Sequence, residues 1–420
     1  MSILLKNARV IDPSQNIDQV CDILIEDGRI AGVGENLPAA DEVIDCTGLV
    51  AAPGLVDMHV HLRDPGQTHK EDVFSACRAA AAGGVTSLLA MPNTTPAMDS
   101  PEVITVLLEK AKTADANVYT TACITKGLAG EETVDFAAVK AAGAIALSDD
   151  GKPVGSTACL LEALKAAPKL GLTVTAHCED LSLAAGGLMN EGETSKNLGV
   201  KGIPNAAEDC GTAREIAAAA SIGAPVHICH VSTRGSVELI RDAKRRGIKV
   251  TAETCPHYLL LTDEALRAKD ADYRMNPPLR TPADVQALKR ALLDGTLDAV
   301  STDHAPHTPE EKADFYTAPN GSIGMETSLA AVHTAMGETM SLSQIIDKMS
   351  TSPAKILGIP AGTLCVGANA DIVLFDPEKA WIVDPEKLHG KSRNTPFKGM
   401  TLKGCVIATY VRGRKVYELQ

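Results

Sequence analysis

The pattern of apolar and polar positions differs between the middle of the chain and its two ends. In the middle, short apolar runs alternate with stretches of helical periodicity. The apolar runs predict eight strands, at 49–61, 84–91, 117–123, 144–148, 172–177, 225–230, 248–253 and 297–302. The stretches between them predict helices at 71–82, 101–113, 155–169, 207–222, 235–246 and 282–294. An open doubly wound sheet would alternate too, but eight units without a glycine-rich phosphate loop favour a closed (β/α)8 TIM barrel.

Both ends of the chain read as short strands joined by tight turns. Asp27-Gly28 separates two apolar runs near the N-terminus, and this dipeptide favours a two-residue hairpin turn. Arg412-Gly413 separates two further runs near the C-terminus. We therefore predict a small β-sandwich built from both termini, residues 1–52 and 359–420, beside a barrel formed by residues 53–358.

Composition narrows the class of protein. The net charge of −13 over 420 residues argues against nucleic acid or an anionic membrane surface as the main partner, although it allows a small anionic substrate. The N-terminus shows no signal peptide, and the longest apolar stretches are too short or too interrupted to cross a membrane. The eleven cysteines form no Cys-x-x-Cys pair, which predicts free thiols in a cytoplasmic protein.

Side chains that can bind a metal follow the predicted strands. His59 and His61 are two residues apart on a strand, so they share one face with Arg63. Candidates of the same kind follow other strands: Asn93, Asp149, Asp150, His177, His227, His230, His257, Asn276, Asp303, His304 and His307. Each of them alone is more often a structural residue than a ligand. Because the active sites of such barrels lie at the C-terminal strand ends, the joint pattern predicts a site there, with donors that suit zinc.

Spacing ranks some of these candidates. His227 and His230 are three residues apart and face opposite sides of a strand, so His230, at the strand end, is the better ligand. His304 follows an aspartate directly and should point away from it, so we expect a structural role there. Alternation does not decide between Asp149 and Asp150, because the strand is ending at these positions.

Two motifs carry a resemblance to a known family. One is Asp57-Met58-His59-Val60-His61-Leu62-Arg63-Asp64-Pro65-Gly66, and the other is Ser301-Thr302-Asp303-His304-Ala305-Pro306-His307, followed by Lys312. With these motifs, and over its whole length, the chain resembles the amidohydrolase superfamily and, within it, the longer, type I bacterial dihydroorotases. This resemblance implies reversible cyclisation of N-carbamoyl-L-aspartate to L-dihydroorotate in pyrimidine biosynthesis. It also implies a homodimer and an association with aspartate transcarbamoylase.

The resemblance further implies roles for individual residues. It implies one or two zinc ions, with two favoured, held by His59, His61, Asp150, His177, His230 and Asp303. Asp150 is chosen over Asp149 by the family's Asp-Asp-Gly motif and would be shared by both ions. The implied substrate contacts are Arg63, Asn93 and His307 to the carboxylate, and Asn276 and the backbone at Gly321 to the ring. A zinc-bound hydroxide would attack the ring amide, with Asp303 as general base and then general acid.

Two alternative functions remain open at this point. Dihydropyrimidinases, hydantoinases and allantoinases resemble the chain overall, but they usually carry a carboxylated lysine at the bridging position. This chain has Asp149-Asp150 there, and the next lysine along the chain is Lys152. The second alternative is a non-catalytic scaffold for aspartate transcarbamoylase, which would have no need of six intact ligands. The stretch 304–325, rich in proline and glycine, is long enough to act as a lid.

Overall fold

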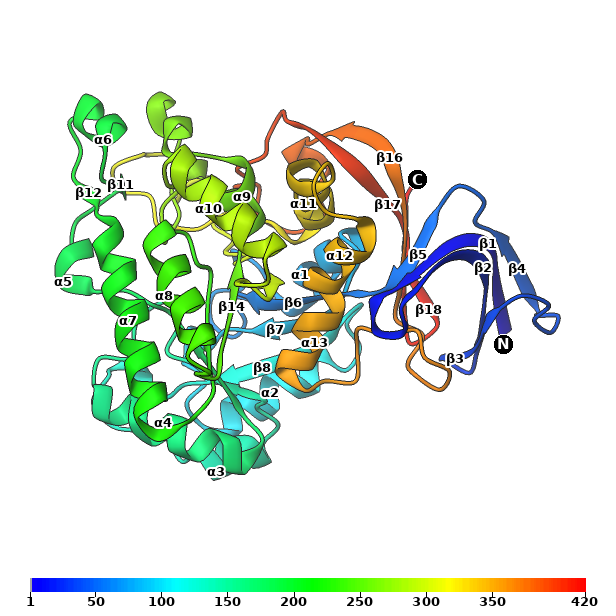
Figure 1. Cartoon of the computed structure of the whole chain (residues 1–420), viewed down its shortest axis with the longest axis horizontal. Coiled ribbons are helices and arrows are strands. Elements are labelled where there is room, and N and C mark those ends of the chain that lie inside the picture. Colours follow the sequence, from blue (N-terminus) through cyan, green and yellow to red (C-terminus); the bar gives the residue numbers. More distant parts are fainter. Residues whose placement is uncertain (1) are drawn as a thin grey trace.

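The computed structural model describes residues 2–420, and its centre is the predicted barrel of parallel strands (Figure 1). Its strands are β6 (Leu55–Val60), β7 (Val85–Ala90), β8 (Asn117–Ala122), β9 (Ala146–Leu147), β10 (Thr173–Ala176), β13 (Val226–Ile228), β14 (Val250–Thr254) and β15 (Ala299–Val300). They pair in sequence order from β6 to β15. A single bridge between Val60 and His304 closes the ring, where His61 N donates to His304 O at 2.8 Å. The predicted TIM barrel is confirmed.

Helices surround this barrel, and the longer ones bury apolar side chains in one core with its strands. The longer ones are α1 (Val73–Ala82), α2 (Pro101–Ala111), α4 (Thr157–Leu170), α7 (Asn205–Ile222), α8 (Arg234–Arg245), α10 (Pro282–Leu293) and α11 (Ser328–Met336). The shorter ones are α3 (Phe136–Ala141), α5 (Leu181–Ala184), α6 (Glu193–Leu198), α9 (Pro256–Leu260), α12 (Leu342–Ile346) and α13 (Ser352–Leu357). A two-stranded ladder, β11 (Met189–Asn190) with β12 (Gly202–Ile203), lies in the connection after β10. Among the residues from 2 onward, no helix is both long and apolar enough to cross a membrane.

The strand predicted at 49–61 is wrong in one respect, since it is two strands in two different sheets. β5 (Val50–Pro53) belongs to the sheet of the termini, and β6 begins the barrel at Leu55. Gly54 separates them at a point of close approach. A Cβ atom on Gly54 would lie 2.2 Å from the Thr86 side chain, so only glycine fits between the sheets.

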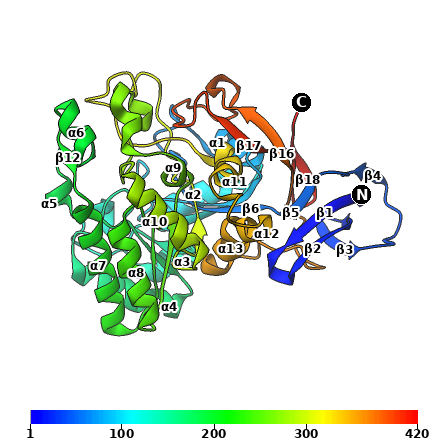
Figure 2. The same cartoon turned by 45° about the horizontal axis from the view of Figure 1, so that its top comes forward.

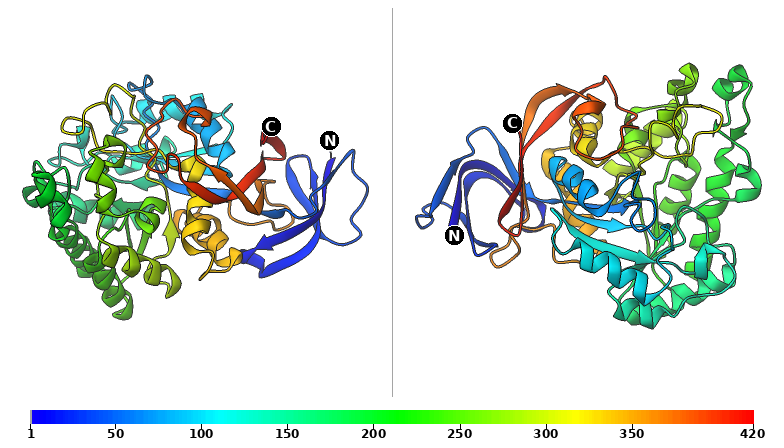
Figure 3. Two further views of the ribbon diagram at one scale, coloured as in Figure 1. Left: turned by 90° about the horizontal axis from the view of Figure 1, so that it is seen from above. Right: turned by 180° about the vertical axis from the view of Figure 1, so that it is seen from behind.

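Both termini contribute to a second sheet beside the barrel, as predicted (Figures 2 and 3). Its strands are β1 (Ser2–Asp12), β2 (Ile17–Glu26), β3 (Arg29–Gly34), β4 (Glu42–Asp45), β5, β16 (Ile372–Ile382), β17 (Thr401–Val411) and β18 (Arg414–Glu418). They form one hydrogen-bonded sheet in the order β18-β17-β16-β5-β1-β2-β3, with β4 also paired to β1. β5 joins the two halves, parallel to β1 and antiparallel to β16. The domain boundaries at 52/53 and 358/359 stay a prediction.

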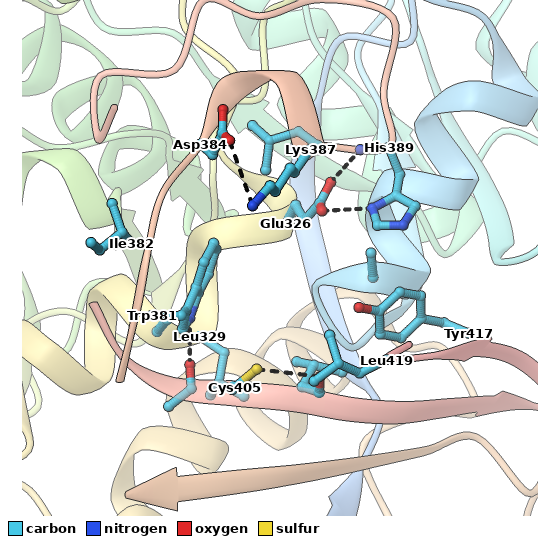
Figure 4. A pocket seen from close by; sticks show the side chains of 15 residues that line it. Glu326, Leu329, Trp381, Ile382, Asp384, Lys387, His389, Cys405, Tyr417 and Leu419 are labelled. Atoms are coloured by element: carbon cyan, nitrogen blue, oxygen red, sulfur yellow. Dashed lines mark hydrogen bonds and ion pairs between the residues drawn. The ribbon is translucent and has the colours of Figure 1, made fainter. Parts of the chain in front are cut away.

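The sheet of the termini meets the barrel domain where β17 approaches α1 and α11 and β18 approaches α1. This junction leaves a cavity of about 170 Å³, shown in Figure 4. Its walls are held by hydrogen bonds: Trp381 Nε1 donates to Gly404 O at 3.0 Å, and Glu326 accepts from the backbone N and Nδ1 of His389 at 2.8 and 2.7 Å. From His389 the chain runs to Asn394, which reaches the loop that follows β15.

Candidate metal centre and substrate pocket

A pocket of about 230 Å³ opens at the C-terminal ends of the barrel strands. Its lining residues are His61, Arg63, Asn93, Asp150, Gly151, His177, His230, Asn276, Asp303, Ala305, His307, Asn320 and Gly321. Of the eleven site residues proposed from the sequence, ten line this pocket, and His59 is completely buried against two of them. The barrel thus brings together side chains that are more than 250 residues apart in the chain.

Asp150 lies at the centre of four histidines. Its Oδ2 is 3.3 Å from His59 Nε2 and 3.5 Å from His61 Nε2. Its Oδ1 is 3.4 Å from both His177 Nδ1 and His230 Nε2. Each carboxylate oxygen therefore faces its own pair of imidazole nitrogens, which is the arrangement that a carboxylate shared between two cations requires.

Asp303 joins this cluster from the other side of the barrel seam. Its Oδ1 lies 3.0 Å from His61 Nε2 and 3.6 Å from His59 Nε2. The residue has a φ of 49°, in the left-handed region, so the backbone turns sharply just after β15. This turn directs the carboxylate into the pocket, whereas the neighbouring His304 points away and accepts from Gly324 N through its Nδ1 at 3.2 Å.

Oxygen atoms hold the outer nitrogens of three of these imidazoles. Asn93 Oδ1 is 2.8 Å from His61 Nδ1, and Glu179 Oε2 is 3.2 Å from His177 Nε2. Glu253 Oε1 is 3.3 Å from His59 Nδ1. Such contacts fix which ring nitrogen faces a metal and orient the ring.

Glu179 and Glu253 are functional candidates that the sequence analysis missed. Glu253 is the last residue of a run predicted as an apolar strand, and Glu179 lies two residues after another such run. A carboxylate at the end of an apolar run is the signal that could have identified them. The opposite oxygen of Glu253, Oε2, lies 3.3 Å from His227 Nε2. His227 therefore lies deeper in the barrel than His230, whose Nε2 reaches Asp150.

The charges in the cluster favour the ionised form of its aspartates. Burial by itself would raise the pKa of Asp150, but His59, His177 and His230 hold this pKa well below its usual value. Burial likewise opposes ionisation of Asp303, yet His61 and His59 lower its pKa. The pKa of His177 would fall through burial, but Asp150 and Glu179 raise it to about 10. The buried carboxylates therefore favour a positive charge between them.

The donor set fits a metal centre. Two groups of three donors, His59 with His61 and Asp150, and Asp150 with His177 and His230, have their nearest ligand atoms within 4.8 Å of one another. His59 Nε2, which faces Asp150 and Asp303, has no hydrogen-bond partner among residues 2–420, although the side chain is fully buried. Imidazole and carboxylate donors are a set that suits zinc, and a bound cation would satisfy this nitrogen.

Arg63 supplies a buried cation on the wall of the same pocket. Its side chain is almost fully buried, and burial lowers its pKa to about 10. Nε donates to Pro306 O at 3.2 Å, and one terminal nitrogen lies 3.2 Å from His307 Nε2. Within the described part of the chain, no carboxylate lies within ion-pair distance of Arg63. An uncompensated buried guanidinium favours an anionic ligand.

Arg63 lies on the pocket wall, but not for the reason that the sequence predicted. β6 ends at Val60, and Arg63 has a φ of 60°, so it does not continue the strand row of His59 and His61. The backbone has already turned into the loop. His61 and Arg63 still line one pocket, with His59 buried against Asp150 and Asp303, but loop geometry and not strand alternation brings the arginine there.

The other proposed substrate contacts also lie on the pocket wall. Asn276 Nδ2 donates to Glu179 Oε1 at 3.0 Å, and His307 Nδ1 lies 3.1 Å from Glu311 Oε2. Gly321 has a φ of 141°, and an added Cβ would clash with Ala305 at 2.8 Å. Its own N–H and C=O are both hydrogen-bonded within the protein.

His257, one of the candidates that follow the strands, is fully buried, and its ring packs edge-to-face against Tyr258 at 4.1 Å between centroids. Its Nε2 has no partner among the described residues. Burial lowers the pKa of this imidazole to about 4, so the ring is neutral at physiological pH.

Comparisons with known proteins agree with the geometry. A family model described as Dihydro-orotase-like matches residues 48–236. The dihydroorotase of Citrifermentans bemidjiense is 50% identical over 423 aligned residues, which cover 100% of both chains. The dihydroorotase of Geobacter metallireducens is 49% identical, again over 100% of both chains. The chain belongs to the dihydroorotase family.

Solved structures confirm the fold expected for a member of the dihydroorotase family. An L-hydantoinase (dihydropyrimidinase) from Arthrobacter aurescens superposes with a TM-score of 0.89 at 26% identity. The match covers 99% of this chain and 96% of that chain. The predicted family and the predicted barrel are therefore both confirmed, and the similarity extends over the sheet of the termini as well.

Proposed function

We propose that the chain catalyses the reversible cyclisation of N-carbamoyl-L-aspartate to L-dihydroorotate, the dihydroorotase step of pyrimidine biosynthesis. Membership of the dihydroorotase family supports this reaction. The observation that carries the proposal is one pocket that holds the Asp150-centred histidine cluster and, on its wall, the uncompensated cation of Arg63. A cyclic amide that bears a carboxylate would meet both features at once.

We propose two zinc ions in this pocket. His59, His61 and Asp303 would hold one, His177 and His230 the other, and Asp150 would be shared. The separate contacts of the two Asp150 oxygens support this assignment. When bound, zinc supplies an activated water at neutral pH and polarises the amide carbonyl.

Asp303 is proposed to move the proton. Its lowered pKa keeps the carboxylate ionised at neutral pH despite burial, because of His61 and His59. In the hydrolytic direction the carboxylate accepts a proton from the attacking water and returns it to the ring nitrogen that leaves. In the synthetic direction the same proton travels back. A single carboxylate thus serves as base and then as acid.

Arg63, Asn93 and His307 are proposed to bind the substrate carboxylate. The guanidinium offers a planar pair of donors, which a lysine could not copy. Burial and the charge of Arg63 lower the pKa of His307 to about 3, so this imidazole stays neutral and does not add a second cation. Asn276 and the backbone around Gly321 are proposed to contact the ring, where they would exclude water and fix its orientation.

The similarity to a hydantoinase makes other cyclic amides the relevant competitors. Those substrates lack the carboxylate that Arg63 would bind. Purified protein should therefore be assayed side by side on dihydroorotate, dihydrouracil, hydantoin and allantoin, with the zinc content measured on the same sample. Turnover of dihydroorotate at least 100-fold above the others is expected, since one lost charged contact costs about 1.5–3 kcal/mol and several are lost. Faster turnover of a ring without a carboxylate would overturn the proposal.

The cellular setting of the enzyme is likewise proposed. A cytoplasmic location is supported by eleven unpaired cysteines. A homodimer and an association with aspartate transcarbamoylase are proposed from the family resemblance. Light scattering of the isolated chain, and then of a mixture with aspartate transcarbamoylase, tests both. Activity of the isolated chain would exclude the scaffold alternative.

A further inference from the structure

Lys312 is a buried cation with an unusual set of partners. The residue is 8% exposed and lies in the loop that follows β15. Its Nζ donates to three backbone carbonyls, those of Arg274, Pro319 and Gly321, at 3.1, 3.0 and 3.0 Å. Among residues 2–420, no carboxylate lies within ion-pair distance of it. Burial of an ammonium without a directly paired carboxylate is costly, and these three hydrogen bonds offset part of the cost.

The three carbonyls belong to two segments that line the substrate pocket. Arg274 lies two residues before Asn276, while Pro319 and Gly321 flank Asn320, and both asparagines are pocket residues. In a trans peptide the C=O and the following N–H point in opposite directions. The bond to Lys312 therefore also fixes the direction of the Asn320 N–H, away from Lys312. One ammonium sets the orientation of peptide groups on both segments.

Asn394 is hydrogen-bonded to the same loop and belongs to a different part of the chain. It lies between β16 and β17, in the part of the chain that builds the sheet of the termini. Its Nδ2 donates to Gly321 O at 3.1 Å and to Ala305 O at 3.3 Å, and its Oδ1 accepts from His307 N at 3.2 Å. Gly321 O thus accepts hydrogen bonds from both Lys312 and Asn394.

We propose that Lys312 is a positioning residue that places the Gly321 segment against the bound substrate ring, with Asn394 as its second anchor. The assignment rests on the proposed function, because the ring must occupy this pocket. Lys312 touches neither the histidine cluster nor Arg63, so it acts on substrate binding through the backbone and not on the reacting atoms. The sheet of the termini, through Asn394, then contributes to the shape of the active site.

The test is Lys312→Met, which keeps the length of the side chain and removes the donor. The KM for dihydroorotate should rise at least 10-fold while kcat changes less than about 3-fold and zinc content stays the same, because ring binding and not chemistry is affected. Hydrogen exchange at residues 318–323 should become faster by a similar factor. Lys112→Met, at an exposed lysine paired only with Glu109, is the matched control and should match the wild type.

Several outcomes would overturn the inference. An unchanged KM, a fall in kcat alone, loss of zinc, or unchanged exchange at 318–323 would each show that Lys312 does not position this segment. Should Lys312→Met fail to fold, Asn394→Ala is the second test, and it should likewise raise the KM for dihydroorotate and speed hydrogen exchange at residues 318–323. If the wild type does not turn over dihydroorotate, the proposed function fails, whereas the exchange measurement still decides whether Lys312 holds the segment.

Discussion

Replacement of Glu253 with glutamine should weaken metal binding without unfolding the barrel. Glu253 is fully buried on β14, with Oε1 3.3 Å from His59 Nδ1 and Oε2 3.3 Å from His227 Nε2. Burial opposes ionisation of this carboxyl, but the two imidazoles hold its pKa far below the usual range. Glutamine is neutral, so it removes the charge that favours a proton on His59 Nδ1. Because it has the same shape and keeps an oxygen acceptor, the packing stays intact.

The size of the effect follows from the geometry. Two unit charges at the 3.3 Å separation of Glu253 and His59 interact by about 5 kcal/mol at an effective dielectric constant of about 20. The imidazole of a metal-bound histidine carries only part of a charge, and the glutamine oxygen retains part of the attraction. A loss of about 2 kcal/mol is therefore expected, which corresponds to a ~30-fold weaker metal affinity. This value lies inside the range of ~10–100-fold found for partners of metal-binding histidines.

Competition with a chromophoric zinc chelator measures this affinity on metal-free protein. Glu238→Gln, at a glutamate that is 63% exposed and paired with Arg241, is the control and should bind zinc like the wild type. Circular dichroism of the metal-free variants checks that both remain folded. A zinc affinity of Glu253→Gln within about 3-fold of the wild type, a difference below about 0.7 kcal/mol, would refute the orienting role of Glu253.

Further predictions concern the substrate site, the proton, the metal and pH. Arg63→Lys should raise KM about 10–100-fold through loss of the two-pronged donor, with zinc content unchanged; steady-state kinetics with metal analysis checks this, and loss of zinc instead would contradict it. Asp303→Asn should keep the fold, because asparagine tolerates the left-handed φ of 49°, but lose nearly all turnover; near-normal kcat would exclude Asp303 as the proton carrier. Chelation of the metal should lower Tm, and added zinc should restore it, since buried His59 and the neighbouring ligands lose the cation that they hold. Identical melting curves would argue against a structural contribution of the metal. Burial lowers the pKa of Lys312 from 10.5 to about 8. The cost of about 3 kcal/mol is therefore fully present below pH 8 and is relieved as pH rises towards 10.5. Denaturant titrations should show that the wild type gains stability relative to Lys312→Met over this window, and a constant difference would contradict the shift.

The sequence by itself determined the architecture and most of the candidate site. Strand and helix periodicities are local properties, so eight alternating units predicted a barrel before any contact was known. The barrel rule then placed polar strand-end residues together, and Asp150, His177 and His230 do meet there. Choice of Asp150 over Asp149 came from resemblance, and the structure supplies a local reason. Asp149 accepts from the backbone N–H groups of Ile124 and Thr125 at 2.8 and 2.9 Å, away from the pocket.

Only the tertiary structure decided the contacts that orient the site. Glu253 meets His59 across the barrel interior, and Asn394 reaches Gly321 from a segment that reads as a connection within the sheet of the termini. The break at Gly54, which sends one apolar run into two sheets, also depends on a neighbour, Thr86, that lies on another strand. Periodicity reports which face of an element is apolar, but it does not report which distant atom lies 3 Å from a given nitrogen. That information arises only when the ring of strands closes and its loops pack.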